Sequence, residues 1–327
     1  MLTFFRTNQI FSSIFLIFYI ALLRFSVFLA PFKWNPSGQG IFSEWVYGWV
    51  GSQDAGSHLL AMVLLLVQGF LLNVLTINNR LSNEVNLFPG VFYVLFCSLL
   101  PDFLYLSPVL MGNTFFILAL LNLFDTYKNP ACADKIFNAG FLTGVASLFY
   151  FPFVFFFIVL MAGLNILRAF NIQERLMVVI GMFVPFFLTG LYFFWFDKLD
   201  FFWQHQVAGN VAFLSFGAGL IGWEHYLKIF IFALAMLYAI VNNNDYLIKK
   251  NIQVQKKISI LFWVLVAAGM AAIFQAGLTF EHLLMLAPSL GVFFGLSFTA
   301  MRPQWAESIH FLMVVGALTL QFFPWLF

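Results

Sequence analysis

The residues best suited to chemistry in this 327-residue chain are acidic side chains that stand beside histidines. Asp54 precedes His58 by four residues, and an acidic residue directly precedes the histidine in Glu224-His225 and Glu281-His282. A carboxylate in such a place can take a proton from a sugar hydroxyl or hold a divalent cation that binds a phosphate. A charged imidazole can donate a hydrogen bond to a phosphate oxygen. Glu44, which precedes Asp54 in the chain, is a further acidic candidate. The candidate catalytic residues are therefore Glu44, Asp54, His58, Glu224, His225, Glu281 and His282.

A structural role at the start of a helix explains the same acidic residues without catalysis. Asp54, Glu224 and Glu281 each stand where an apolar run begins. A carboxylate in the first turn of a helix faces the positive end of the helix dipole, which stabilises it there. The chain has no phosphate-binding P-loop, no GxGxxG, GxSxG or HExxH motif and no CxxC pair. Nucleotide hydrolysis and serine or zinc hydrolysis therefore have no motif support, and both explanations of the acidic residues stay open.

The composition places these residues in a membrane protein. Hydrophobic residues make up 63% of the chain and charged residues 9%, whereas soluble domains have about 45–50% and about 25%. No stretch has the composition of a separate water-soluble domain, so residues 1–327 are predicted to form one integral membrane domain. The net charge of +2 is too small for a nucleic-acid-binding protein. We therefore expect an all-α, polytopic transmembrane helical bundle with no nucleic-acid partner.

Apolar runs long enough to cross a bilayer, about 20 residues each, set the expected spans. One run, 136–167, has 32 residues without a charge and would be about 48 Å long as a single helix. Pro152 in its middle disfavours helical geometry in the residue before it, so this run is either one tilted helix or a hairpin of two short helices. The other runs lie near 9–31, 57–77, 87–106, 108–124, 175–196, 224–242, 257–275, 281–300 and 306–325.

The distribution of basic residues favours the hairpin. With two short helices in 136–167 and a cytoplasmic N-terminus, eleven of the fifteen lysines and arginines fall on the cytoplasmic side, as the positive-inside rule requires. Arg24 and Lys228 then lie near the outer ends of spans, where their long side chains can reach the headgroup region. The sequence thus predicts eleven spans in the inner (cytoplasmic) membrane, with the C-terminus in the periplasm.

Two outer loops and a few intramembrane polar residues complete the expected architecture. The loops 31–56 and 197–223 mix aromatic and polar residues and are predicted to lie as amphipathic segments in the membrane interface. They form either a structural aromatic belt or a platform for a lipid-linked substrate. Polar side chains inside spans usually hydrogen-bond between helices, and this role is expected for Asn73, Asn122, Gln275 and His310.

Three stretches resemble a family of uncharacterised inner-membrane proteins of the Bacteroidetes lineage. They run from Phe137 to Pro152, from Ile166 to Arg175 and from Gly181 to Pro185. Members of this family are of similar size and have no established activity. The resemblance covers nearly the whole chain and implies a polytopic inner-membrane protein without implying a reaction.

A second resemblance is partial, to the membrane glycosyltransferases of the GT-C type and the related polysaccharide polymerases. Gly140 to Leu148 is similar to their Gly-x-x-x-Gly hairpin helix, and Ser107-Pro108 and the stretch Glu281 to Pro288 resemble their layout. The resemblance implies a catalytic acidic residue in the first outer loop, which Asp54 or Glu44 matches by position, and a polyprenyl-phosphate sugar as donor. The paired acidic motif usual in that loop is absent.

Three functions follow as hypotheses. The first is a lipid-linked sugar transferase or polymerase-like protein of envelope glycan assembly, with membrane lipid and a lipid-linked glycan as partners and a divalent cation as a possible cofactor. The second is a non-catalytic subunit or scaffold that binds other envelope proteins. The third is a transporter or flippase. The first requires the acidic residues at the starts of spans to line a single outward-facing site.

The topology can be tested by reporter fusions. If 136–167 is a hairpin, reporters fused after Asn171 and after Asn251 should both give a cytoplasmic signal, because the basic residues around both sites then stay inside. A periplasmic signal at either site would contradict the eleven-span topology.

Overall fold

The computed structural model describes residues 2–6, 10–29, 39–210, 223–248, 250–273 and 280–322, and every regular element in these ranges is a helix. The α-helices are α1 (Ile10–Leu23), α2 (Phe25–Leu29), α3 (Ile41–Val50), α4 (Ala55–Asn78), α5 (Phe88–Phe96), α6 (Pro108–Phe124), α7 (Ala133–Phe149), α8 (Phe157–Leu167), α9 (Ile172–Trp195), α10 (Leu199–Phe202), α11 (Trp223–Val241), α12 (Asn243–Leu247), α13 (Ile252–Ile273), α14 (Ala287–Ala300) and α15 (Pro303–Phe322). Short 3₁₀ segments are η1 (Leu2–Phe5), η2 (Pro101–Phe103), η3 (Phe151–Phe156), η5 (Ala208–Asn210) and η6 (Phe280–Leu286), and η4 (Trp203–Val207) is a π-helix.

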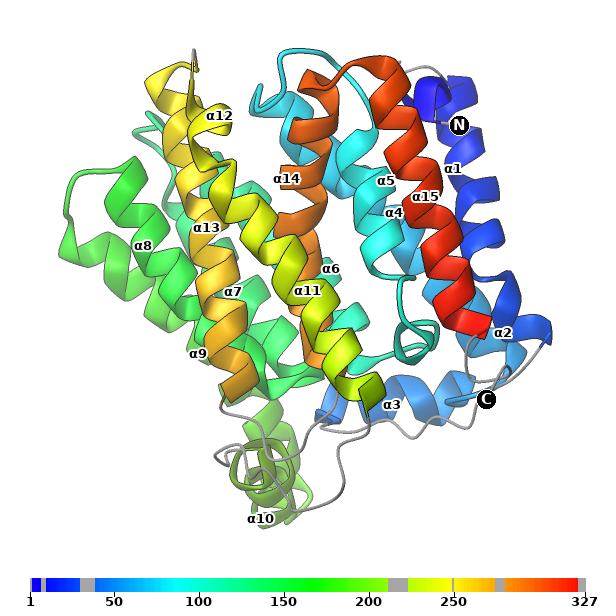
Figure 1. The fold of residues 1–327 in the computed structure, drawn as a ribbon. Coiled ribbons are helices and arrows are strands. Elements are labelled where there is room, and N and C mark those ends of the chain that lie inside the picture. Colours follow the sequence, from blue (N-terminus) through cyan, green and yellow to red (C-terminus); the bar gives the residue numbers. More distant parts are fainter. Residues whose placement is uncertain are drawn as a thin grey trace.

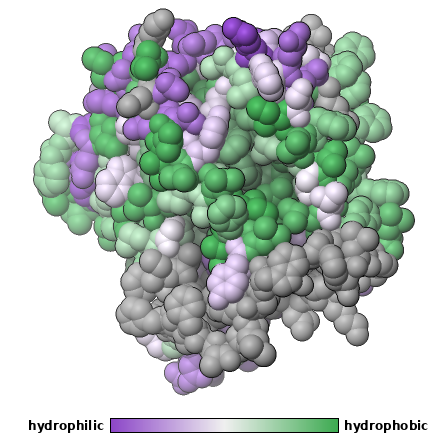
Figure 2. Space-filling model, in the orientation of Figure 1, coloured by the Kyte–Doolittle hydropathy of each residue, from purple (hydrophilic) through white to green (hydrophobic). Residues whose placement is uncertain are grey.

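The long helices lie side by side as a bundle, and α3 lies across one end of it (Figure 1). We call this end the α3 end and the opposite one the α12 end. Figure 2 shows apolar residues over the middle of one face and hydrophilic residues gathered at the α12 end. An apolar band of this kind is what contact with lipid tails requires. Within the described ranges, five helices are long and apolar enough to cross a membrane, so the chain is a multi-pass membrane protein.

The count of eleven spans is not confirmed. The five long helices are Ala55–Asn78, Ile172–Trp195, Ile252–Ala271, Phe280–Ala300 and Pro303–Phe322. Several other predicted spans are shorter in the structure because irregular backbone interrupts the apolar run. In the run 87–106, α5 has only 9 residues before the chain turns and forms η2. A helix of 9 residues is about 14 Å long, about half of a bilayer's hydrocarbon thickness.

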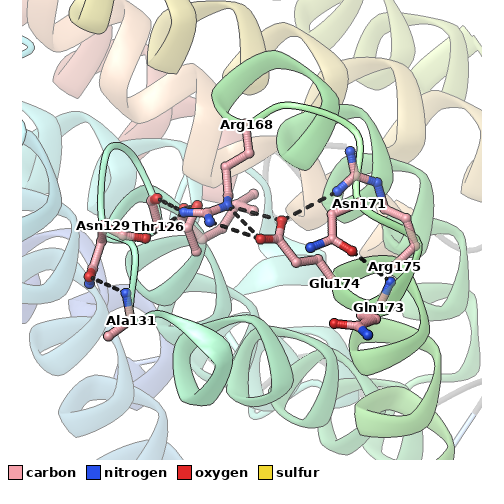
Figure 3. A network of polar contacts seen from close by, with 9 residues as sticks. Thr126, Asn129, Ala131, Arg168, Asn171, Gln173, Glu174 and Arg175 are labelled. Carbon is pink, nitrogen blue, oxygen red and sulfur yellow. Dashed lines mark hydrogen bonds and ion pairs between the residues drawn. The ribbon is translucent and has the colours of Figure 1, made fainter.

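The run 136–167 is a hairpin of two helical segments, as the loop charges predicted. The first helix, α7, ends where Tyr150 adopts an extended conformation before Pro152, and the chain continues through η3 into α8. Figure 3 shows what closes the hairpin at the α12 end. Arg168 donates to both carboxylate oxygens of Glu174, at 2.8–3.0 Å, and to the carbonyl oxygens of Thr126 and Asn129. One guanidinium therefore joins the end of α8 to the loop before α7 and to the start of α9.

Glycines bring α7 and α9 into close contact. A Cβ atom added at Gly140 would lie 2.4 Å from the carbonyl oxygen of Val178, and one added at Gly144 would lie 2.5 Å from that of Met182. From the other helix, a Cβ atom at Gly181 would lie 2.5 Å from the carbonyl oxygen of Phe137. Contacts below 3 Å to backbone atoms leave no room for a side chain. This is the close approach that glycines spaced by four residues allow in membrane helices.

The expected role of the intramembrane polar residues holds for two of the four. The Asn73 side-chain oxygen of α4 accepts from the backbone nitrogen of Gly90 in α5, at 2.8 Å. The His310 Nε2 of α15 lies 3.0 Å from the hydroxyl of Tyr19 in α1. For Asn122 the expectation is wrong, since its amide donates to the carbonyl of Leu118 in its own helix. Gln275 lies outside the described residues.

The glycine contact between α7 and α9 gives a matched pair of variants. Gly144→Ala should lower the melting temperature in mild detergent, because the added methyl group collides with the carbonyl of Met182 and overpacking costs about 1–3 kcal/mol. Gly269→Ala in α13 is the control, since a Cβ atom there has no neighbour within 4 Å. The control should keep or slightly raise the melting temperature, as alanine favours helix. Equal effects of the two substitutions would show that the contact is incidental.

Candidate functional site at the α3 end

The connection between α5 and α6 is the centre of the candidate site. Residues 97–107 are mostly non-helical and mostly buried, and buried backbone groups in a membrane protein need hydrogen-bond partners. Arg24 supplies two of them, donating to the carbonyl oxygens of Phe103 and Leu104 at 2.8 Å each. The hydroxyl of Tyr47 in α3 donates to the carbonyl of Leu106 at 2.6 Å. The connection is thus held from the end of α1 and from α3.

The expectation that Arg24 and Lys228 extend toward the headgroup region is wrong for Arg24. Its side chain is 1% exposed, because the carbonyl groups of the 97–107 connection offer the guanidinium acceptors inside the protein. The side chain of Lys228 is partly exposed, but its ammonium group contacts other parts of the protein. Its ammonium lies 2.5 Å from the Asp102 carboxylate and 4.9 Å from the centre of the Phe280 ring. This ion pair joins α11 to η2, and the ring contact joins α11 to η6.

Glu281 lies in the same region. It is 3% exposed in η6, next to Phe280. Burial, together with the negative charge of Glu281, raises the pKa of Tyr47, which places the carboxylate within electrostatic range of that phenol. His282 follows in η6 and is half-buried. Two of the predicted site residues therefore stand beside the 97–107 connection.

His58 reaches the connection from α4. It is 7% exposed, and its ring centre lies 5.5 Å from that of Tyr105 and 6.1 Å from that of Phe28. This residue, predicted from its spacing to Asp54, therefore faces the interior of the site.

Asp54 occupies the exposed rim and begins α4. Its carbonyl oxygen accepts from the backbone nitrogens of Ser57 and His58, at 3.0 and 3.2 Å, while its carboxylate makes no capping hydrogen bond. A Cβ atom at Gly51 would lie 1.8 Å from the carboxylate oxygen, and Gly51 has a φ of +78°, so only glycine suits this turn. The carboxylate is thus available at the surface beside the buried His58.

Glu44 stands apart from this cluster. Its carboxylate lies 2.8 Å from Nε2 of His205 in η4, and both side chains are about one-third exposed. Beside this pair, Gln206 accepts from the backbone nitrogen of Ile41 at 2.9 Å and donates to the carbonyl of Ser147 at 2.8 Å. The described parts of the predicted loops 31–56 and 197–223 therefore pack on each other and on the tip of the hairpin. Their remainders, 31–38 and 211–222, lie outside the described residues.

The predicted site residues are only partly brought together. Glu224 and His225 lie in the first turn of α11, one turn before Lys228, but their side chains lie outside the described part of the structure. Sequence reasoning missed Asp102, Tyr47 and Tyr105 and assigned Arg24 to the headgroup region. The signal for Asp102 was present, since an ionisable residue at the end of an apolar run is a functional candidate.

A metal centre made by the protein alone has no support in the described residues. Among them, no group of three or more histidine, cysteine, aspartate or glutamate side chains could hold a metal ion. The divalent cation predicted for phosphate chemistry would need ligands from the phosphate and from water, which is common for Mg²⁺.

No family model matches the chain, and neither does any curated protein. Among solved structures, the chain is similar to ArnT from Cupriavidus metallidurans, whose crystal structure is bound to undecaprenyl phosphate. The TM-score is 0.57 and the sequence identity 15%, and the match covers 94% of this chain and 59% of ArnT. ArnT is a GT-C glycosyltransferase. The chain therefore has a fold similar to that of ArnT. The GT-C-like resemblance seen in the sequence thus extends to the fold, while the resemblance to the uncharacterised family stays an expectation.

The buried arginine gives a direct test of how the site is held together. Arg24→Met should lower the free energy of unfolding by about 2–4 kcal/mol, because two carbonyl groups lose charged donors that are each worth about 1.5–3 kcal/mol. Arg302→Met, at an exposed position, is the control and should leave stability unchanged. Thermal unfolding in mild detergent compares the two variants, and equal melting temperatures would contradict the role given to Arg24.

Proposed function

We propose that this chain is a GT-C-like sugar transferase that uses a polyprenyl-phosphate sugar as donor in envelope glycan assembly. It works in the inner membrane with its α3 end toward the periplasm. Support comes from the fold shared with ArnT, a protein bound to undecaprenyl phosphate in its crystal structure. The chain spans 59% of the length of ArnT, so the proposal concerns the membrane-embedded reaction site and not the whole of that protein.

The observation that carries the proposal is a pair of buried nitrogen atoms at the α3 end. Within the described residues, Arg24 Nε and His58 Nδ1 are buried and have no hydrogen-bond partner. Leaving a buried polar atom unpaired costs about 1–3 kcal/mol. Both side chains contact the 97–107 connection. A phosphate oxygen of the donor would accept from the guanidinium and, when the imidazole is protonated at Nδ1, from the histidine as well.

Asp54 is the proposed general base. In the transfer, an acceptor hydroxyl oxygen attacks the anomeric carbon of the donor sugar, and the bond from that carbon to the phosphate oxygen breaks. The hydroxyl proton passes to the Asp54 carboxylate, and the polyprenyl phosphate leaves with the bonding electron pair. The exposed position of Asp54 lets an acceptor approach from the aqueous side, while Arg24 and His58 hold the phosphate from beneath. Asp102 keeps Lys228 in place beside the connection, and the hydroxyl of Tyr47 is held by the carbonyl of Leu106.

A non-catalytic membrane subunit is the second candidate function. The observation in its favour is the place of Asp54 at the start of α4, where a carboxylate stabilises a helix without any reaction. The transporter hypothesis has less support, since transporters are usually built of repeated halves with broken helices at matching positions, and no repeat is visible in the sequence.

A complementation experiment separates the two leading functions. In a deletion strain, Asp54→Asn should insert normally and bind undecaprenyl phosphate, yet reduce the envelope glycan product by about 10²–10⁴-fold, the usual contribution of a general base. Glu44→Gln is the matched control, because Glu44 pairs with His205 away from the connection, and it should restore most of the product. Full complementation by Asp54→Asn would contradict the catalytic role and favour the non-catalytic subunit.

A further inference from the structure

A second cavity lies at the α12 end, away from the proposed reaction site. It has a volume of about 480 Å³ and opens between the 82–84 loop, the end of α11, α12 and the end of α14. Its wall is polar, with the hydroxyls of Tyr246 and Ser297 2.8 Å apart. Three charged side chains line it, those of Glu84, Asp245 and Lys250. We call it the polar pocket.

An apolar groove adjoins the polar pocket. It has a volume of about 650 Å³ and is walled by α11 on one side and α15 on the other, with α5 and α14 as its floor. Figure 1 shows α14 in the space between α11 and α15, and Figure 2 shows apolar surface on this face below the hydrophilic α12 end. Tyr238 and Met301 line both cavities. The two together therefore form one amphipathic site, polar at the α12 end and apolar along the bundle.

The charges of the polar pocket limit what can fill it. Lys250 donates to the carbonyl of Leu81 and to the side-chain oxygen of Asn83, and an ammonium has a third proton to give. Glu84 is paired with Arg6 at 3.3 Å, whereas Asp245 is exposed at the start of α12. The wall thus presents one cationic donor and two exposed carboxylates, of which that of Glu84 is already paired with Arg6. A headgroup with only negative charge would be repelled by the carboxylates of Glu84 and Asp245. A zwitterionic headgroup can place its negative charge at Lys250 and its positive charge at Asp245.

We propose that the polar pocket and the apolar groove bind one glycerophospholipid with a phosphoethanolamine headgroup. Its phosphate accepts from Lys250, its ammonium group pairs with Asp245, and one acyl chain fills the groove between α11 and α15. The lipid bridges α11 and α15, and its headgroup lies at the end of the bundle opposite the proposed reaction site. This role is independent of the sugar-transfer proposal.

Native mass spectrometry of the delipidated protein tests the proposal. Phosphatidylethanolamine and phosphatidylglycerol with the same acyl chains are titrated separately. The wild type should bind one phosphatidylethanolamine at least tenfold more tightly than phosphatidylglycerol. Asp245→Asn should weaken phosphatidylethanolamine binding about tenfold, which equals about 1.4 kcal/mol, because the ammonium group loses its charged partner. The same substitution should reduce the headgroup preference.

A glycine that lines the apolar groove, Gly316, allows a second test of the proposal. A Cβ atom at Gly316 has no neighbour within 4 Å, so Gly316→Phe can fill the groove and should abolish binding of the lipid. Gly269→Phe is the matched control, since Gly269 also has open space but lies outside the groove, and it should bind as the wild type does. Equal affinity for the two lipids, or unchanged binding by both Asp245→Asn and Gly316→Phe, would overturn the proposal. If Gly316→Phe does not fold, unchanged phosphatidylethanolamine affinity of Asp245→Asn is enough to overturn the proposal.

Discussion

The connection between α5 and α6 leaves helical geometry inside an apolar protein, where its carbonyl groups cannot rely on water. Helices satisfy their own backbone, but irregular segments at membrane depth must be satisfied by other parts of the protein. The guanidinium of Arg24 does this for Phe103 and Leu104, and Tyr47 does it for Leu106. The polar character of the α3 end follows from this constraint, because each donor brings a charge or a hydroxyl into a region that would otherwise be apolar.

Other features of the site depend on the same segment. Asp102 stands in the connection and pairs with Lys228 of α11, and Tyr105 contacts the ring of His58 at the start of α4. Through Phe280, Lys228 also contacts η6, which carries Glu281. Residues far apart in the sequence therefore meet around one short connection. A buried arginine and histidine with nitrogen atoms that lack protein partners among the described residues suit a region that binds an anion.

The general architecture could be predicted from the sequence, because it depends on composition, on single prolines and on the distribution of charges along the chain. The excess of apolar residues predicted a helical membrane bundle, and Pro152 and the loop charges predicted the hairpin. The number of spans was not predictable in this way, because hydropathy does not show where a run such as 87–106 leaves helical geometry. The sequence singled out His58 by its spacing to Asp54 and Glu281 by its place at the start of an apolar run, and the structure places both beside the 97–107 connection. Their catalytic role stays a prediction. The burial of Arg24 could not be predicted, because it depends on carbonyl groups about 80 residues away in the chain.

A structure of the protein bound to undecaprenyl phosphate, determined by electron cryo-microscopy in lipid nanodiscs, would test the central claim most directly. We expect phosphate density at the α3 end, within hydrogen-bond distance of Arg24 or His58 and beside the 97–107 connection. Phosphate density at the α12 end, or an α3 end that stays closed around Arg24 while the lipid binds elsewhere, would contradict it.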